Sequence, residues 1–187
     1  MKTEMEKMRR GEAYAFTDAA MLESLHRANR LCVKLNALTM EDADYRATLE
    51  ELVPGIDGTS SICPPFYCDH GHGIIVGEHT FINRSCDMLD EGFIRIGARC
   101  KVGPDCRFYT VNHPLDYRKR REPCELALPI EIGDDVWIGG GVTVCPGVRI
   151  GSRSVIAAGS VVCSDIPEDS LAAGNPARVK RKLTISK

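Results

Sequence analysis

The chain has 187 residues, 43% hydrophobic and 27% charged, a balance typical of one folded domain with room for a small appendage. Its net charge of -2 gives no reason to expect binding to nucleic acid or to an anionic membrane. The polar N-terminus has no signal-peptide pattern and no segment has the roughly 20 apolar residues that cross a bilayer, so we expect a cytoplasmic protein.

Residues 1–54 have a helical pattern. Asp18 can cap a first helix whose apolar residues recur every three or four positions: Met21, Leu22, Leu25, Cys32 and Leu35. Thr39 and Asp42 have the spacing of a capping box, which predicts a second helix ending near Leu52. Two short helices bury little surface alone, so we expect 1–54 to form a cap on a second unit, 55–187.

A six-residue period replaces the helical pattern after residue 54. Aliphatic residues recur in strict register at Ile132, Ile138, Val144, Ile150, Ile156 and Val162, and the earlier half repeats the pattern around Val76, Ile82, Ile96 and Val102. Each hexapeptide supplies one short strand and a corner, and stacked coils bury the aliphatic column. The period therefore predicts a β-solenoid.

The nine cysteines are odd in number and form no C-x-x-C pair, which argues against a disulfide framework and a zinc ribbon. Cys86, Cys100 and Cys106 occupy the small-residue position of their hexapeptides, where a small buried hydrophobe fits. Cys145 and Cys163 are one coil apart and should stack in the same way. We expect reduced, structural thiols rather than a catalytic cysteine.

A polar insertion at about 111–129 breaks the six-residue register. It carries the basic run Arg118–Arg121, which by itself predicts only a solvated face. A loop of this length that leaves a tight solenoid is rarely without function. His113 lies at its root, before Pro114, and is therefore the best catalytic candidate among the five histidines.

These features resemble those of the hexapeptide-repeat acyltransferases, whose mainly β fold is a left-handed parallel β-helix. Thr110-Val111-Asn112-His113-Pro114 is similar to the active-site segment of the maltose and galactoside O-acetyltransferases. Two further segments resemble that branch: the Gly11–Asp18 segment of the cap and the C-terminal Ala173–Arg178 segment. The resemblance covers nearly the whole chain.

The resemblance implies transfer of an acetyl group from acetyl-CoA to a hydroxyl of a maltose-, glucose- or galactoside-type sugar, by direct attack in a ternary complex. His113 would be the general base, since a neutral imidazole has a pKa near ~6.5 and can take the proton of an alcohol. Asn83 is the candidate donor to the tetrahedral intermediate. The resemblance further implies a homotrimer with sites between subunits and no required metal.

The implied acceptor contacts are Asp18, Asp69, Asn83, Asp90 and the neighbouring Glu91. Each of three of these residues also has a purely structural interpretation. Asp18 could serve only as a helix cap, and Asp69 and Asp90 could serve only as turn residues. Glu125, near the far end of the loop, could orient His113 or touch the acceptor. The chain departs from the family in the segment after Asn83, where Ser85 and Asp87 replace the usual residues, so the identity of the acceptor stays open.

Coenzyme A should lie along the solenoid wall, and the resemblance implies contacts from Gly140, Ala158, Cys163 and Ser164. Many relatives have Ser, Thr and Lys where this chain has Gly140, Cys163 and Ser164. A lysine contact to phosphate is then missing, and Arg178 and Arg181 in the C-terminal basic run could replace it.

Three alternatives stay open. Acetyltransferases of the superfamily that act on serine or on antibiotics share the solenoid. A γ-type carbonic anhydrase would bind zinc through three histidines, for which His70, His72 and His79 are candidates. A non-catalytic scaffold or ligand-binding module is the third.

Overall fold

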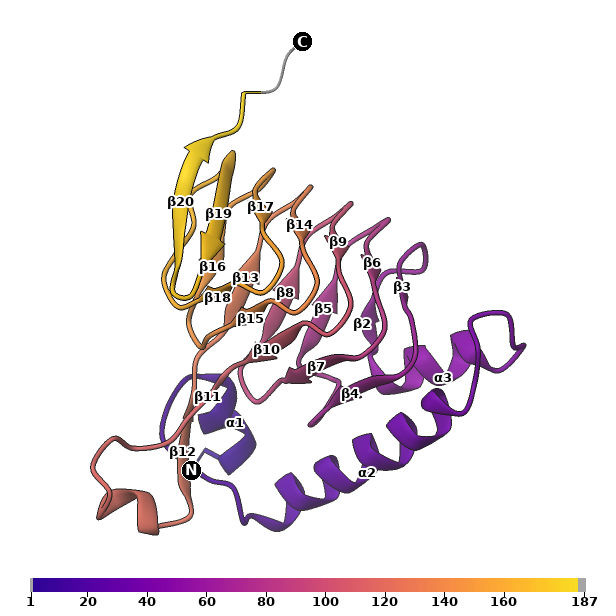
Figure 1. The fold of residues 1–187 in the computed structure, drawn as a ribbon. Helices are drawn as coiled ribbons and strands as arrows, with labels where there is room; N and C mark the ends of the chain where they lie inside the picture. The colour runs from indigo at the N-terminus through magenta and orange to yellow at the C-terminus, as the bar shows by residue number, and fades with distance from the viewer. Residues whose placement is uncertain (1, 185–187) are drawn as a thin grey trace.

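The computed structural model describes residues 2–184 and has the predicted mainly β fold, a parallel β-helix (Figure 1). Three sheets form its faces, and parallel pairing joins equivalent strands of successive coils. The first face contains β2 (Gly55–Ile56), β5 (Ile74–Val76), β8 (Ile94–Ile96), β13 (Ile130–Ile132) and β16 (Arg149–Ile150). The second contains β3 (Ser61–Ile62), β6 (Phe81–Ile82), β9 (Lys101–Val102), β14 (Trp137–Ile138), β17 (Val155–Ile156), β19 (Ser170–Gly174) and β20 (Ala177–Lys182). The third contains β4 (Phe66–Cys68), β7 (Cys86–Leu89), β10 (Arg107–Tyr109), β15 (Thr143–Val144) and β18 (Val161–Val162).

The hexapeptide register positions the core. All six aliphatic residues that define the period are at most 4% exposed: Ile132, Ile138, Val144, Ile150, Ile156 and Val162. Ile132 pairs with Ile150, 18 residues and one coil later, so equivalent side chains stack in a column. The column is the apolar surface whose burial stabilises the solenoid.

The cysteine prediction is only partly correct. Cys86, Cys100 and Cys106 are fully buried, as expected of a small hydrophobe. Cys145 lies beside the next coil, where its N–H donates to the carbonyl of Val162 at 2.9 Å. However, Cys145 is half-buried and Cys163 is exposed, because these two positions follow the inward-facing Val144 and Val162 and lie at the corner.

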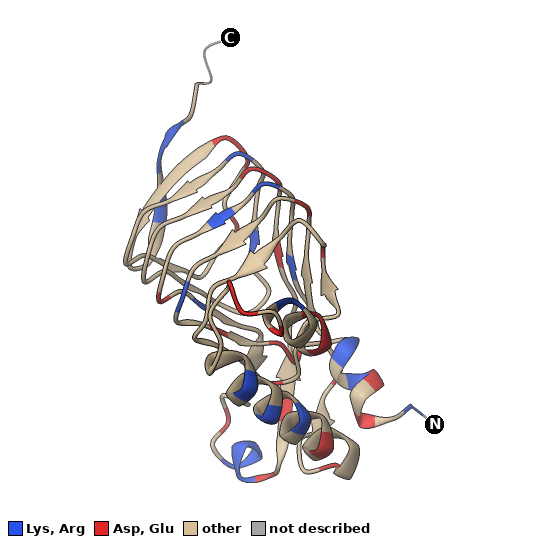
Figure 2. Cartoon of the chain, turned by 90° about the vertical axis from the view of Figure 1, so that its right-hand side faces the viewer, with Lys and Arg blue, Asp and Glu red and all other residues tan. Residues whose placement is uncertain are grey.

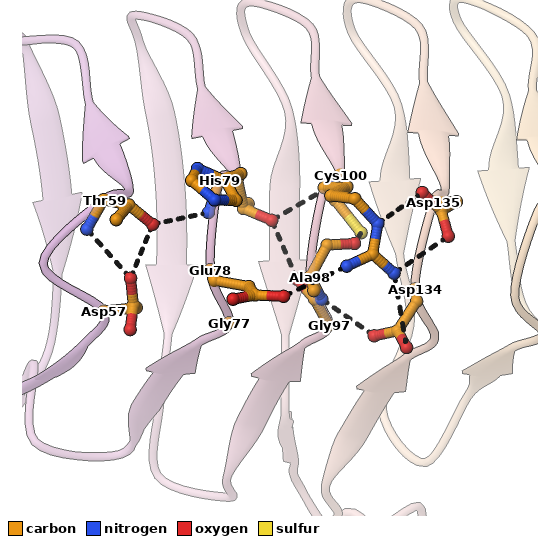
Figure 3. A network of polar contacts seen from close by, with 12 residues as sticks. Asp57, Thr59, Gly77, Glu78, His79, Gly97, Ala98, Cys100, Asp134 and Asp135 are labelled. Carbon is orange, nitrogen blue, oxygen red and sulfur yellow. Dashed lines mark hydrogen bonds and ion pairs between the residues drawn. The ribbon is translucent and has the colours of Figure 1, made fainter.

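One corner of the solenoid combines strained backbone with stacked polar contacts (Figure 3). Five successive coils place a non-glycine residue with positive φ there: His79, Arg99, Asp135, Arg153 and Asp169, with φ between 54° and 60°. The left-handed conformation is unfavourable for L-residues. Bonds between coils offset this cost; the Arg99 guanidinium, for example, lies 2.9 Å from Asp135. Figure 2 shows that acidic and basic residues both occur along the solenoid and on the cap.

The cap contains three helices: α1 (Glu4–Arg9), α2 (Ala19–Asn36) and α3 (Tyr45–Leu52). Asp18 caps α2 as predicted, since its Oδ1 accepts the N–H groups of Ala20 and Met21. The predicted start of the second helix is wrong. Thr39 does donate to Asp42, but this contact closes a separate turn and α3 begins only at Tyr45. The sequence did not lead us to predict α1. This helix begins with a capping box formed by Thr3 and Glu6.

Within residues 2–184, none of the helices combines the length and the apolar character needed to cross a membrane.

Candidate active site

The loop that interrupts the repeat is held closed at its root. Its two ends form a hairpin of β11 (Val111–Asn112) and β12 (Cys124–Ala127), with a 3-10 turn, Lys119–Arg121, near its tip. Thr110 lies just before β11, and its buried hydroxyl donates to the carbonyl of Leu89 and accepts the N–H of Gly92. The threonine of the His113 segment is therefore a structural residue that fixes where the loop leaves the solenoid.

The N-terminal segment forms the third strand of the loop sheet. β1 (Tyr14–Ala15) pairs antiparallel with β12, and Tyr14 lies opposite Glu125. A small second core, Met8, Tyr14, Met21 and Ala127, joins the cap to the loop. Sequence reasoning missed this pairing, because a two-residue strand has no periodicity to detect; the only signal was Tyr14 within the cap segment.

His113 opens onto a cleft of about 430 Å³. Its side chain is 55% exposed, so the imidazole is accessible to small molecules. Its Nε2 lies 3.6 Å from Oε1 of Glu125, whose other oxygen, Oε2, accepts the hydroxyl of Tyr14 at 2.7 Å. The cleft is further lined by Ala13, Asn112, Pro114, Leu115, Cys124 and Leu126. An accessible imidazole beside a held carboxylate is an arrangement suited to proton transfer.

A second cavity, of about 270 Å³, lies between the cap and two corners of the solenoid. We call it the acidic pocket; it is lined by Tyr14, Phe16, Met21, Leu22, Leu25, Asp69, His70, Glu91 and Glu125. Leu22 and Leu25, which were predicted only to lie on the helix that Asp18 caps, form part of the pocket's apolar wall. Glu125 lines both cavities, so the two adjoin.

The carboxyl groups of Asp69 and Glu91 share one environment in this pocket. Burial and the neighbouring Asp69 raise the pKa of Glu91 to about 10. Burial, and to a lesser degree the charge of Asp90, also raises the pKa of Asp69. At neutral pH the pair therefore holds a proton, since two adjacent buried carboxylates do not both ionise readily.

Asp90 does not face either cavity, in contrast to its predicted role as an acceptor contact. It is fully buried, and its carboxylate accepts the N–H groups of His70 and Gly71 at Oδ1 and of Gly73 at Oδ2. Gly71 has a positive φ of 77°, and a Cβ there would collide with the carbonyl of Leu52. Asp90 thus holds the turn that positions Asp69. This agrees with the alternative interpretation of Asp90 as a turn residue.

Arg9 from α1 covers Asp90 from the outside. Its guanidinium lies 3.8 Å from the Asp90 carboxylate and donates to the carbonyl of Glu91 at 2.9 Å. It also contacts Nδ1 of His72 at 2.8 Å. The first helix is therefore fastened to the corner that carries Glu91.

The three histidines proposed as zinc ligands do not converge. His70 and His72 both contact the hydroxyl of Ser24 on α2, at 2.8 Å and 3.0 Å. His79 lies on a different corner, where its N–H bonds to Thr59 (Figure 3). Among residues 2–184, no group of three or more His, Cys, Asp and Glu side chains is arranged to hold a metal ion.

Asn83 and Asp18 lie apart from His113 in the chain. Asn83 lies just before β7, at the amino end of a strand of the third face, and accepts the N–H of Arg84 at 2.8 Å. His113 instead follows β10 and β11, beyond the carboxyl end of that face. Asp18 is half-buried at the start of α2, next to the acidic pocket, and its Oδ1 is used as a cap. The structure therefore places Glu125 beside His113, and Asp69 and Glu91 in the adjoining pocket, but it does not bring Asn83 to the site.

Only some of the residues predicted to bind coenzyme A lie close to one another. Gly140 and Ala158 line a groove of about 490 Å³ with Pro104, Trp137 and Leu171 among its other walls. Cys163 and Ser164 are exposed on a later corner and do not line it. Arg178 and Arg181 are exposed on β20, where Arg181 pairs with Leu171. Trp137, 59% exposed, was missed, although an aromatic residue at an outward-facing strand position was a usable signal.

Comparisons with known proteins agree with the fold and the repeat. Residues 129–164 match the family model described as bacterial transferase hexapeptide (six repeats). A Staphylococcus aureus protein named as a candidate acetyltransferase is 43% identical over 183 residues, 97% of this chain and 92% of its own.

Two solved structures extend the similarity over the full length. A Vibrio cholerae hexapeptide-repeat acetyltransferase, solved with acetyl-CoA, is 42% identical, with a TM-score of 0.88 over 98% of this chain and all of its own. A maltose O-acetyltransferase from Clostridium difficile is 36% identical, with a TM-score of 0.95 over 98% of this chain and 99% of its own.

Proposed function

The chain is an acetyltransferase that belongs to the hexapeptide-repeat family, and we propose that it transfers the acetyl group of acetyl-CoA to a hydroxyl of a maltose-, glucose- or galactoside-type sugar. The observation that carries the proposal is the position of His113, exposed in a cleft and 3.6 Å from a carboxylate oxygen of Glu125. The cleft adjoins a pocket rich in carboxylates, which suit a hydroxyl-rich acceptor.

His113 acts as the general base in this proposal. Its imidazole takes the proton of the acceptor hydroxyl while the oxygen attacks the thioester carbonyl carbon. The tetrahedral intermediate then breaks its carbon–sulfur bond, and the proton passes to the departing thiolate, so no protein nucleophile and no metal ion is needed. A positioned base contributes roughly 10²–10⁴-fold to the rate. Glu125, held by Tyr14, orients the ring and stabilises the imidazolium.

The groove beside Gly140 and Ala158 is the proposed path of coenzyme A. Its walls are largely apolar, which suits the pantetheine arm, and the exposed Trp137 can contact it. The basic strand β20, with Arg178 and Arg181, follows the same face and supplies guanidinium groups for phosphate. Cys163 and Ser164 lie farther along the wall and would contact the cofactor beyond the groove.

A homotrimer would complete the site. Asn83 lies far from His113 within the chain, so it can donate to the tetrahedral intermediate only if a second copy supplies it. Mixing His113→Ala and Asn83→Ala proteins tests this, since some sites of a mixed trimer regain both residues. Recovered activity supports a shared site, and two variants that stay inactive when mixed oppose it. The free cysteines are compatible with the reducing cytoplasm, where we expect the enzyme to act.

The direct test incubates the protein with acetyl-CoA and a panel of acceptors, with products detected by mass. The panel contains maltose, glucose, a galactoside, serine and a hydroxylated antibiotic. A product from a sugar alone supports the proposal. A product from serine or the antibiotic alone supports the non-sugar alternative, and coenzyme A binding without any product indicates a binding module. Mass detection is preferable to thiol reagents, which the nine cysteines would consume.

A further inference from the structure

The acidic pocket has negative charge without a positive partner. Asp69, Glu91 and Glu125 line it, and none of its lining residues is Lys or Arg. The nearby Arg9 guanidinium is directed at Asp90 and at the backbone of the corner. Burial lowers the pKa of His70 to about 4, so this ring is neutral at physiological pH. Because Asp69 and Glu91 share one proton, the pair keeps one negative charge, which a cationic ligand can balance.

Two buried polar atoms of this pocket's walls lack hydrogen-bond partners. They are Oε2 of Glu91 and Nε2 of His70, on side chains that are 7% and 0% exposed. Buried polar groups are normally satisfied, so each unsatisfied one asks for an explanation. Both residues line the pocket, so a bound ligand can supply the missing partners.

We propose that the acidic pocket binds a protonated amine of the acceptor, which makes an amino sugar the preferred substrate. This inference rests on the proposed function and narrows its acceptor class. A neutral sugar hydroxyl could satisfy one hydrogen bond but would leave the charge uncompensated. An ammonium group offers three donors and a positive charge together. Phe16, Met21 and Leu25 give the apolar wall that the carbon face of a sugar ring requires.

The position of Glu125 connects the site proposed for the amine with the site proposed for the reacting hydroxyl of the same acceptor. Because Glu125 lines both the pocket and the His113 cleft, an amine held by Asp69 and Glu91 leaves a hydroxyl of the same ring directed towards His113. An amine held as ammonium has no free electron pair and cannot attack the thioester. The product is therefore an ester of the amino sugar, not an amide.

The test compares glucosamine, N-acetylglucosamine and glucose, which differ in charge at one position. Calorimetry measures their binding to the full-length protein, and mass detection measures acetyl transfer. We expect glucosamine to bind, and to react, at least about tenfold better than the two neutral sugars. The double variant Asp69→Asn, Glu91→Gln, which removes the charge of the pair, should lose this preference, whereas the exposed Glu51→Gln should retain it. The acetylated product should be cleaved by hydroxylamine, as an ester is.

The outcomes separate this inference from the proposed function. Glucosamine that binds preferentially to the wild type but not to the double variant, and is not acetylated, would support the pocket's assignment and count against the proposed reaction. Transfer to glucose or N-acetylglucosamine with equal or higher efficiency would overturn the inference and leave the reaction standing. A hydroxylamine-resistant amide product, or a preference that survives in the double variant Asp69→Asn, Glu91→Gln, would also overturn it.

Discussion

Oε1 of Glu125 lies 3.6 Å from Nε2 of His113, on a side chain that Tyr14 holds at its other oxygen. The two residues come from opposite ends of the loop, and the hairpin of β11 and β12 brings them together. A strand of the N-terminal segment fixes the position of Glu125. The proposed base is thus oriented by parts of the chain more than a hundred residues apart in sequence.

Glu125→Gln should lower kcat about 10–100-fold, because the amide keeps the size of the side chain but loses the charge that stabilises the imidazolium. KM for acetyl-CoA should change little, since Glu125 does not line the Gly140 groove. Steady-state kinetics measure both parameters. Glu122→Gln, an exposed change in the same loop, is the control. An unchanged kcat in Glu125→Gln would remove Glu125 from the mechanism.

Asp90→Asn should destabilise the fold by about 3 kcal/mol, because the fully buried carboxylate accepts three backbone N–H groups and an amide cannot accept them all. Denaturant unfolding measures the loss. A variant of unchanged stability that fails only to bind acceptor would instead support the contact that the sequence predicted for Asp90.

Glu91 should make the protein less stable as pH rises. Its pKa is raised from 4.5 to about 10 on folding, by burial first and Asp69 second. Below the pKa of Glu91 in the unfolded chain, Glu91 is protonated in both the folded and the unfolded state, and its contribution to the free energy of unfolding is fully present. Above it the unfolded state releases the proton that the folded state keeps, so the free energy of unfolding falls until pH reaches the folded pKa.

Glu91→Gln cannot titrate and should remove this decline. The decrease in unfolding free energy between about pH 5 and pH 9 should be smaller than in the wild type, by at most about 1.4 kcal/mol per pH unit. Urea unfolding at several pH values measures the slope. Equal slopes in both proteins would show that Glu91 does not retain a proton on folding.

Gly140→Leu should raise KM for acetyl-CoA about tenfold or more, because a large side chain would fill the groove that Gly140 lines. KM for the acceptor should stay near its wild-type value. Gly58→Leu is a matched control, since an added Cβ at Gly58 meets no atom within 4 Å. A Gly140→Leu enzyme with normal acetyl-CoA kinetics would exclude this groove as the cofactor path.

The repeat made the solenoid predictable because each hexapeptide repeats the same burial requirement, which Ile138 and Ile156 both satisfy. His113 was predictable because it marks the break in that repeat. The pairing of Tyr14 with Glu125 was not, since two-residue strands form only through tertiary contacts. The burial of Asp90 was also hidden, because the same residue type can hold a turn or bind a sugar, and only its neighbours decide between them.

The central claim is that the His113 imidazole performs the proton transfer. Replacing it with alanine should leave the unfolding midpoint close to the wild type, because the side chain is 55% exposed. The same change should lower kcat for acetyl transfer by at least about a hundredfold. His113→Ala protein that folds normally and acetylates the wild-type acceptor at full rate would contradict the account.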